Sequence, residues 1–403
     1  MTRADHPSYN LPTLDTLSVR TRSITRKAVW AVLATTLVAG VVIAGGSAAG
    51  ASSCTSWTYT PSPNRGTGDN VLTAVDADST CDAWAVGYSF ATARYVTLVE
   101  HWNGTSWAIK GTPNSGTGPN YLEAVRALSP TNVWAVGYHD TGTAFRTLVM
   151  HWNGKTWSVV ASPNRGTGDN ELLGVRAPSS TNAWAVGYSN TGTRDVTLIE
   201  HWNGHSWSIH SSPNAGTGAN YLDAIGSSSA TNVWAVGWQA VGSDHQTLIE
   251  HWNGSSWSVK ASPDLGPIDD SLAAVRVGST TNAWAVGSSY GASEYRTLTE
   301  HWNGTSWSVV SSPNGGTSEN KLTGLVIVSP TSVWAAGHTT EGAVFQTLVD
   351  HWNGSSWSIT SSPDEGTGNN FLNGMSATSS TNVWAVGDYY NGSVDQTLIL
   401  HCC

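Results

Sequence analysis

A fifty-residue period organises this chain. The motif Trp134-Ala135-Val136-Gly137 is followed seventeen residues later by His151-Trp152-Asn153-Gly154, and both motifs recur in steps of fifty residues. Self-similarity at a fixed period of this length indicates a repeat architecture, in which each repeat is one supersecondary unit. The first motif begins at Trp84, Trp134, Trp184, Trp234, Trp284, Trp334 and Trp384, and the second at His101, His151, His201, His251, His301, His351 and His401.

Each repeat predicts four short strands. Valine, isoleucine, tryptophan, tyrosine and threonine are enriched in runs bounded by turn-forming residues, which is typical of strands, and no segment shows a sustained helical period. In the repeat that begins at Tyr121, the runs cover residues 122–127, 133–138, 147–152 and 157–160. Between the third and fourth runs, Asn153-Gly154 predicts a hairpin with a type I′ turn, in which both central residues have positive φ.

Seven such units predict a closed ring. A four-stranded antiparallel sheet cannot bury both of its faces alone, whereas radially stacked sheets cover one another, as in a β-propeller. The sequence therefore predicts an all-β, seven-bladed β-propeller with four-stranded antiparallel blades.

The two ends of the repeat region complement each other. Residues 56–60 match the fourth strand of a repeat, whereas residues 397–401 match a third strand with nothing after it. We therefore expect the N-terminal strand to complete the seventh blade and close the ring. An open solenoid would carry atypical capping repeats at its ends instead.

The N-terminal segment resembles an export signal. Basic residues up to Lys27 precede an uncharged, mostly apolar stretch at residues 28–44, and small residues follow. This order is typical of a secretory signal peptide. We assign residues 1–51 to a signal peptide and residues 52–403 to the propeller, and expect a secreted or cell-surface protein. An uncleaved membrane anchor and a lipoprotein with Cys54 as its lipidated residue are the alternatives, because a long apolar segment can span a bilayer.

Four cysteines suit an exported domain. Aligned on the repeat, Cys54, Cys402 and Cys403 all fall at the proposed seam, and Cys81 falls in the turn between the first two strands of blade one. Four cysteines allow three pairings. We favour Cys54–Cys403 with Cys81–Cys402, and an exchange of roles between the adjacent Cys402 and Cys403 is the alternative.

Charge argues against nucleic acid as a partner. The chain holds 18 basic and 28 acidic residues, and residues 1–50 contain five basic and two acidic ones, so the remainder has 18 − 5 = 13 basic and 28 − 2 = 26 acidic residues. Nucleic-acid-binding domains carry a basic footprint instead. We expect a monomer that contacts a membrane only through an uncleaved N-terminal segment.

The repeat resembles the kelch-type propeller family, which includes the propeller domain of galactose oxidase. In these blades a hydrophobic strand ending in glycine is followed by an aromatic strand, a turn and a tryptophan, an order matched by Trp134 to Gly137, Trp152 and Trp157 over about residues 54–403. Kelch repeats usually contain a glycine pair, whereas a single glycine stands here. The chain is closer to tryptophan-rich bacterial repeat proteins, most of unknown function. The resemblance implies the fold, and the copper chemistry of galactose oxidase would need a cysteine away from the seam.

Two repeated motifs are expected to be structural. The seven histidines, most of them preceded by an acidic residue, lie on separate blades, whereas a zinc site needs convergent ligands. We expect them to hold the turn after the third strand. The Gly-Thr-Gly segments, such as Gly116-Thr117-Gly118, precede a strand rather than the helix that a phosphate-binding loop requires, and are interpreted as turns between blades. We expect no metal and no cofactor.

Variation between repeats is concentrated in the loops that join the second and third strands. Loops on a rigid scaffold concentrate binding residues, and tryptophan, tyrosine and arginine dominate binding hot spots. Free drift of unconstrained loops is an equally good explanation of the variation. The expected ligand-contacting residues are Tyr95, Phe145, Arg146, Trp238, His245, Tyr295, Arg296 and Tyr390.

These observations favour a secreted, non-catalytic scaffold that binds a protein or a glycan through its variable loop face. A hydrolase, lyase or oxidase-type enzyme with its site in the central channel is the first alternative, and it predicts a cluster of titratable residues with perturbed pKa values there. The second alternative is a structural cell-surface repeat protein without a ligand. We identify no catalytic residues from the sequence.

Overall fold

The computed structural model describes residue 54 and residues 56–266, 268–291 and 293–403. This part of the chain is all β, and none of it forms a helix that could cross a membrane. The segment interpreted as a signal peptide or anchor lies outside the described residues.

Each of the seven blades is an antiparallel sheet of four strands. The first strands are β2 (Asn70–Ser79), β6 (Asn120–Ser129), β10 (Asn170–Ser179), β14 (Asn220–Ser229), β18 (Asp270–Ser279), β22 (Asn320–Ser329) and β26 (Asn370–Ser379). The second strands are β3 (Asp82–Ala91), β7 (Asn132–Asp140), β11 (Asn182–Asn190), β15 (Asn232–Val241), β19 (Asn282–Tyr290), β23 (Ser332–Glu341) and β27 (Asn382–Tyr390). The third strands are β4 (Arg94–Trp102), β8 (Phe145–Trp152), β12 (Asp195–Trp202), β16 (Asp244–Trp252), β20 (Tyr295–Trp302), β24 (Val344–Trp352) and β28 (Asp395–Cys402). The fourth strands are β5 (Trp107–Ile109), β9 (Trp157–Val160), β13 (Trp207–His210), β17 (Trp257–Lys260), β21 (Trp307–Val309), β25 (Trp357–Ile359) and β1 (Trp57–Tyr59).

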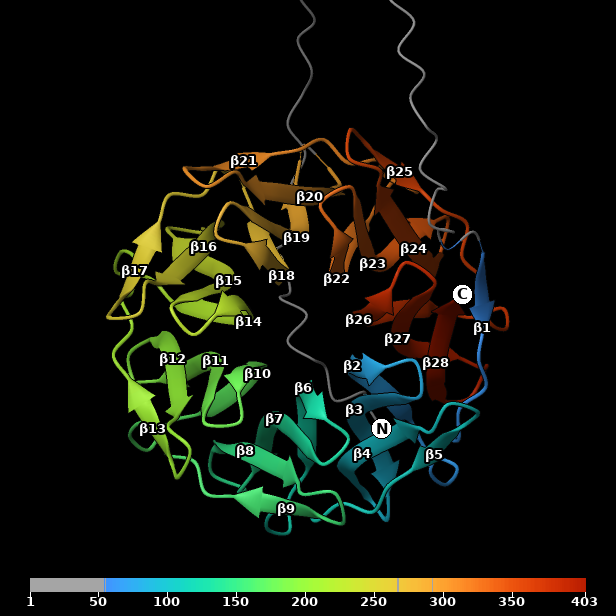
Figure 1. The fold of residues 1–403 in the computed structure, drawn as a ribbon, viewed down its shortest axis with the longest axis horizontal. Coiled ribbons are helices and arrows are strands. Elements are labelled where there is room, and N and C mark those ends of the chain that lie inside the picture. Colours follow the sequence, from blue (N-terminus) through green and yellow to red (C-terminus); the bar gives the residue numbers. More distant parts are fainter. Residues whose placement is uncertain (1–53, 55, 267, 292) are drawn as a thin grey trace, which may run out of the picture. The chain divides into compact units, whose positions relative to one another are not determined.

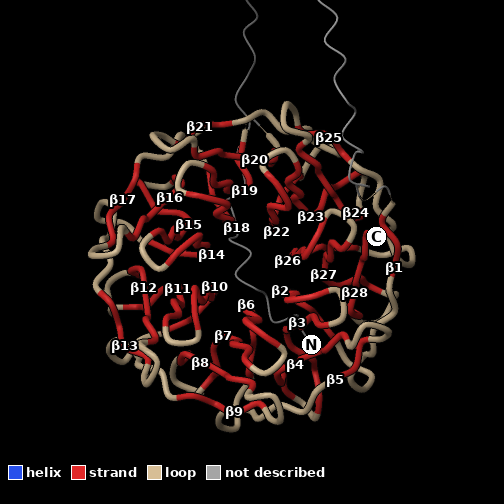
Figure 2. Tube along the Cα trace, in the orientation of Figure 1, coloured by secondary structure: helices blue, strands red, loops and turns tan. Residues whose placement is uncertain are grey.

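The blades surround a central axis, with the first strands innermost and the fourth strands at the rim (Figure 1). Strands dominate the interior of the ring, and the segments that join the blades run along its outside (Figure 2). The prediction of a seven-bladed propeller with four-stranded blades is confirmed.

The ring closes as the sequence predicts. The N-terminal strand β1 joins the last three strands in one sheet, in the order β1-β28-β27-β26, and Trp57 lies opposite Cys402 in the ladder. The closing strand covers residues 57–59 of the predicted 56–60. Thr60 lies beyond its end but still donates a hydrogen bond from its amide to the Ile399 carbonyl oxygen at 2.8 Å.

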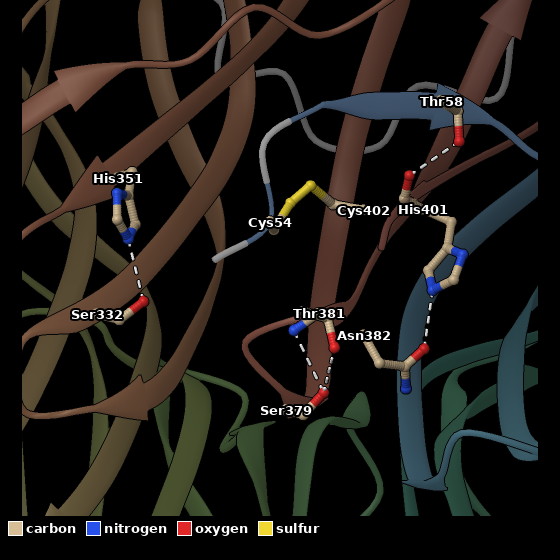
Figure 3. Close-up of a disulfide and its surroundings, with 9 residues drawn as sticks. All are labelled: Cys54, Thr58, Ser332, His351, Ser379, Thr381, Asn382, His401 and Cys402. Atoms are coloured by element: carbon tan, nitrogen blue, oxygen red, sulfur yellow. Dashed lines mark hydrogen bonds between the residues drawn. A yellow bond between two sulfur atoms is a disulfide. The ribbon is translucent and has the colours of Figure 1, made fainter. Parts of the chain in front are cut away.

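One disulfide lies at this seam, and it corrects the favoured pairing. Cys54 is bonded to Cys402, with Cα atoms 5.5 Å apart (Figure 3). Cys403 and Cys81 are free and exposed. Cys402 is the last residue of β28 and points into the buried junction with blade six, while Cys403 lies beyond the end of the strand. Cys81 lies in blade one, against Gly104 of the same blade, and so does not pair with the buried Cys402.

The core consists of tryptophan clusters between neighbouring blades. Trp84 of the second strand in blade one packs against Trp152 and Trp157 of blade two, at ring-centroid distances of 5.1 and 5.4 Å. In the seventh blade the third-strand tryptophan is replaced by Cys402, and the disulfide, together with Trp57, packs near Trp334 of blade six. Burying a large apolar side chain contributes about 1.5–3 kcal/mol, so these clusters account for much of the ring's stability.

The turn after the third strand differs from the predicted type I′ turn. Trp152 pairs with Trp157, so the connection has four residues. Only Gly154 has positive φ, at 92°, and Asn153 does not. The Asn153 side-chain oxygen accepts hydrogen bonds from the amides of Lys155 and Thr156, both at 3.0 Å, and this local capping replaces the two-residue geometry.

Candidate functional site

The repeated histidines are structural. His151 packs against Trp134 with ring centroids 4.3 Å apart, and its Nε2 atom lies 2.8 Å from the side-chain oxygen of Asn132 at the start of the second strand. An equivalent contact is present in every blade, with Asp82 or Ser332 in place of asparagine in blades one and six. The histidines therefore tie the third strand to the second strand rather than to the following turn. The described residues contain no group of three or more histidine, cysteine, aspartate or glutamate side chains that could hold a metal ion.

We call the side that carries the loops between second and third strands the upper face, and the opposite side the lower face. The Gly-Thr-Gly turns between blades share the upper face, since Gly118 lies against Asp140 at the end of β7. Within each turn an asparagine side chain bonds the backbone. Asn120, for example, accepts from the Ser115 amide at 2.7 Å and donates to the Gly118 carbonyl oxygen at 2.9 Å. These turns are rigid supports for the neighbouring strands.

Arg146 has a supporting role on this face. Its guanidinium donates to the carbonyl oxygens of Gly168 and Thr167, at 2.6 and 2.9 Å, and so fastens blade two to the turn that leads into blade three. Arg94 and Arg194 make comparable bonds to Gly118 and Gly218. These arginines hold adjacent blades together.

Tyrosine rings form a continuous cluster across blades one and two. Tyr88 lies 5.4 Å from Tyr95 and 5.0 Å from Tyr121 of the next blade. Tyr121 then contacts Tyr138 at 5.1 Å, and Tyr138 contacts Phe145 at 5.2 Å. Two predicted residues, Tyr95 and Phe145, therefore belong to one cluster with three tyrosines that the loop-based prediction did not include.

A second cluster lies in blades three and four. Tyr188 contacts Tyr221 at 4.5 Å, Tyr221 stacks on Trp238 at 4.2 Å, and Trp238 contacts His245 at 4.2 Å. Both Trp238 and His245 were predicted to contact a ligand, and Trp238 is only 9% exposed. We call the two clusters together the aromatic arc: Tyr88, Tyr95, Tyr121, Tyr138, Phe145, Tyr188, Tyr221, Trp238 and His245.

Carboxylates accompany the aromatic arc. The Tyr95 hydroxyl donates to Asp69 at 3.2 Å, the Tyr188 hydroxyl donates to Glu171 at 2.5 Å, and the Tyr221 hydroxyl bonds to Asp195. Burial raises the pKa of Tyr121 to about 12, so its hydroxyl keeps its proton. The arc therefore presents aromatic faces and acceptor oxygens together.

The other predicted residues lie outside the arc. In blade five, the Tyr295 ring lies under Lys321 of blade six at 4.1 Å, and Arg296 forms an exposed ion pair with Glu294 at 2.6 Å. Tyr390 of blade seven is 39% exposed. The structure places these three residues on the upper side of blades five and seven and does not join them to the two clusters.

The first strands line a central cavity of about 110 Å³. Glu123 and Asp223 are among its lining residues, and burial raises their pKa values to about 8 and about 7. Burial also raises the pKa of Glu171 to about 7, while its hydrogen bond from Tyr188 acts in the opposite direction. These carboxyl groups were not predicted. Glu123 and Asp223 depart from the repeat, because Leu173 and Ala273 occupy the same position in other blades, and this departure is the signal that the sequence offers for them.

Comparison with known proteins defines the fold. No family model and no curated protein matches the sequence. Among solved structures, YCF48 bound to a D1 peptide is 14% identical, with a TM-score of 0.55 over 86% of this chain and 96% of the other. YCF48 from Cyanidioschyzon merolae is also 14% identical, with a TM-score of 0.54 over 86% and 98%. An ulvan lyase from a new polysaccharide lyase family, PL25, is 8% identical, with a TM-score of 0.52 over 82% and 93%. At these identities the likeness is one of fold, and the kelch-like affiliation stays a prediction.

Proposed function

We propose that this propeller is a secreted, monomeric and non-catalytic scaffold that binds a segment of another protein through the aromatic arc on its upper face. The observation that carries the proposal is the contact of aromatic rings between neighbouring blades, once between blades one and two and once between blades three and four. Tyr121 alone contacts Tyr88, Tyr95 and Tyr138. Tyrosine and tryptophan on rigid strands provide large contact areas at a small entropic cost.

The charge of the arc favours a cationic ligand segment. Asp69 and Asp195 lie beside its hydroxyl groups, whereas Arg94, Arg146 and Arg194 are engaged with backbone carbonyl oxygens. A lysine or arginine side chain over an aromatic face gains a cation–π interaction of about 0.5–2 kcal/mol. The structural neighbour described as bound to a D1 peptide supports a protein ligand for a propeller of this kind.

A random peptide library displayed on phage tests this function, with a glycan array as the parallel arm. The proposal predicts that the purified domain of residues 52–403 enriches basic, aromatic-containing peptides. Tyr95→Ala should weaken the selected peptides at least about tenfold, since hot-spot tyrosines contribute about 2 kcal/mol. Val159→Ala on the exposed rim is the matched control. Binding on the glycan array alone would replace the protein ligand with a glycan, and no binding in either arm would favour the structural role.

A second candidate function, a hydrolase or lyase acting on a polymer, is favoured by the raised pKa values of Glu123 and Glu171. A carboxyl group that is protonated near neutral pH is suited to general acid catalysis. The ulvan lyase among the structural neighbours supports the plausibility of this chemistry on such a ring. Release of new chain ends from a panel of polysaccharides, abolished in Glu123→Gln, would establish it, and an inactive wild-type domain would leave the binding function.

A further inference from the structure

The lower part of the central channel concentrates positive charge. One position in each first strand lies toward its lower end, and three of the seven residues there are arginines. Asp76 is the one acidic residue of the set, which consists of Asp76, Arg126, Arg176, Gly226, Arg276, Val326 and Ser376. The charge of this ring is opposite to that of the domain. Without residues 1–50, the chain has 28 − 2 = 26 acidic and 18 − 5 = 13 basic residues.

The arginine side chains converge although they come from different blades. The Arg126 guanidinium donates to Asp76 at 2.9 Å. Arg276 of blade five lines the cavity and reaches the Met375 carbonyl oxygen of blade seven at 3.3 Å. Arg176 donates through Nε to the Ser227 hydroxyl oxygen at 3.4 Å and lies within electrostatic range of Arg126, Asp76 and Arg276.

The single carboxylate does not balance three guanidinium groups. One Asp76 oxygen accepts from Arg126 and from the Ala127 amide at 2.8 Å, and the other accepts from the Ser376 hydroxyl at 3.4 Å. Among the described residues, Arg126–Asp76 is the one ion pair within this ring. Arginines therefore outnumber carboxylates by two at these seven positions, and the buried Nε of Arg126 has no hydrogen-bond partner.

Clustered cations in a partly buried channel repel one another, and this repulsion is relieved when an anion lies between them. Burial is the main cause that lowers the pKa of Arg176, to about 9, and the nearby Arg126 acts in the same direction. The planar guanidinium fork matches the oxygens of phosphate and sulfate groups, with which it forms charge-assisted hydrogen bonds.

We propose that Arg126, Arg176 and Arg276 form a binding site for a compact divalent oxyanion, phosphate or sulfate, on the axis of the propeller near its lower face. The excess of two charges matches a divalent ligand. This site is separate from the aromatic arc and does not depend on the proposed function.

Calorimetric titration of the domain of residues 52–403 with inorganic phosphate and inorganic sulfate, at constant ionic strength, tests the proposal. We expect saturable binding of at least one of the two, with about one anion per chain, and which of them binds more tightly distinguishes a phosphate-selective from a sulfate-selective site. Acetate serves as the monovalent comparison and should bind at least tenfold more weakly. No saturable binding of either divalent anion would overturn the proposal.

Two variants should change the affinity in opposite directions. Arg276→Gln should weaken binding at least tenfold, whereas Asp76→Asn, which raises the excess charge from two to three, should tighten it. Lys155→Gln makes the same charge change as Arg276→Gln at an exposed position on the lower side and should alter affinity less than twofold. Equal effects of Arg276→Gln and Lys155→Gln would contradict the site. If Arg276→Gln does not fold, an unchanged or weaker affinity in Asp76→Asn would contradict it on its own.

Discussion

Thr58 lies directly opposite His401 in the ladder between β1 and β28, and its hydroxyl donates a hydrogen bond to the His401 carbonyl oxygen at 3.1 Å (Figure 3). This contact joins residues that are 343 positions apart in the chain. It places the start of the propeller and its end in one blade, so the stability of the whole ring depends on a junction of three strand residues and one disulfide.

Cys402, which is bonded, and Cys403, which is free, provide a matched pair of positions for testing the disulfide. Cys402→Ser should destabilise the domain by about 5 kcal/mol, because a cross-link that closes a very long loop restricts the unfolded chain. The bond spans 348 residues. Cys403→Ser should change the free energy of unfolding by less than about 0.5 kcal/mol, as for other exposed positions. Denaturant unfolding under oxidising conditions measures both. Equal losses in the two variants would show that Cys403 also forms the bond.

The glycine after the Trp-Ala-Val motif should be irreplaceable. A Cβ atom at Gly137 would lie 2.1 Å from the Tyr121 carbonyl oxygen, a backbone atom that cannot move away without disturbing the strand pair. Gly137→Ala should therefore cost about 2–4 kcal/mol. Gly111→Ala is the control, because a Cβ there meets nothing within 4 Å, and it should be neutral or slightly stabilising. Thermal unfolding of the two variants checks the contrast, which a similar loss in both would contradict.

The buried carboxyl groups should make the free energy of unfolding of the domain depend on pH. Burial raises the pKa values of Glu100, Glu200, Glu250 and Glu300 to about 8 and that of Asp350 to about 7. Between the unfolded pKa near 4.3 and these values, the folded state binds more protons than the unfolded state, so the free energy of unfolding falls as pH rises.

Histidines act in the opposite direction at lower pH. Burial lowers the pKa of His251 to about 4 and lowers those of five others: His151, His201, His301, His351 and His401. The unfolded chain therefore takes up more protons below about pH 6.5, and stability falls on acidification. We expect the unfolding temperature to fall from pH 6.5 to pH 8, because the histidines of the unfolded chain have lost their protons there and the buried carboxyl groups dominate. A steady rise of the unfolding temperature from pH 6.5 to 8 would contradict this account.

One glutamate isolates the carboxyl effect. Both Glu200 oxygens are buried without a hydrogen-bond partner, and Met150 and Leu400 occupy the same position in blades two and seven. Glu200→Gln removes the cost of ionisation and should raise the free energy of unfolding at pH 8 by at least about 1.4 kcal/mol, the equivalent of one pKa unit. The gain should shrink toward pH 5. The exposed Glu341→Gln is the control, and a Glu200→Gln gain that is the same at both pH values would show that ionisation is not its cause.

The periodic sequence predicts the architecture well because each strand repeats its pattern seven times. Residues 56–60 could be assigned to the last blade because Trp57 matches the fourth-strand tryptophan of the other repeats, whereas residues 397–401 match a third strand. The disulfide partner could not be assigned, since a register difference of one residue decides between Cys402, which is buried, and Cys403, which is exposed.

The channel could not be predicted for a different reason. Arg126 and Arg276 lie 150 residues apart in the sequence and meet only because seven first strands surround one axis. The loop-based prediction included Tyr95, Phe145, Trp238 and His245 but not Tyr121, which lies at the start of an inner strand and contacts Tyr95. Variation between repeats within the first strands carries this information, whereas the predicted ligand-contacting residues come from the loops between second and third strands and from the strand ends beside them.

Closure of the ring by β1 is tested most directly by removing it. A chain of residues 61–403 should be compared by denaturant unfolding with the chain of residues 52–403 carrying Cys54→Ser, so that neither has the disulfide. We expect the shorter chain to lose at least about 3 kcal/mol, because it lacks the buried Trp57 and the β1–β28 hydrogen bonds, and to unfold less cooperatively. Identical free energies of unfolding in the two chains would contradict closure of the propeller by its N-terminal strand.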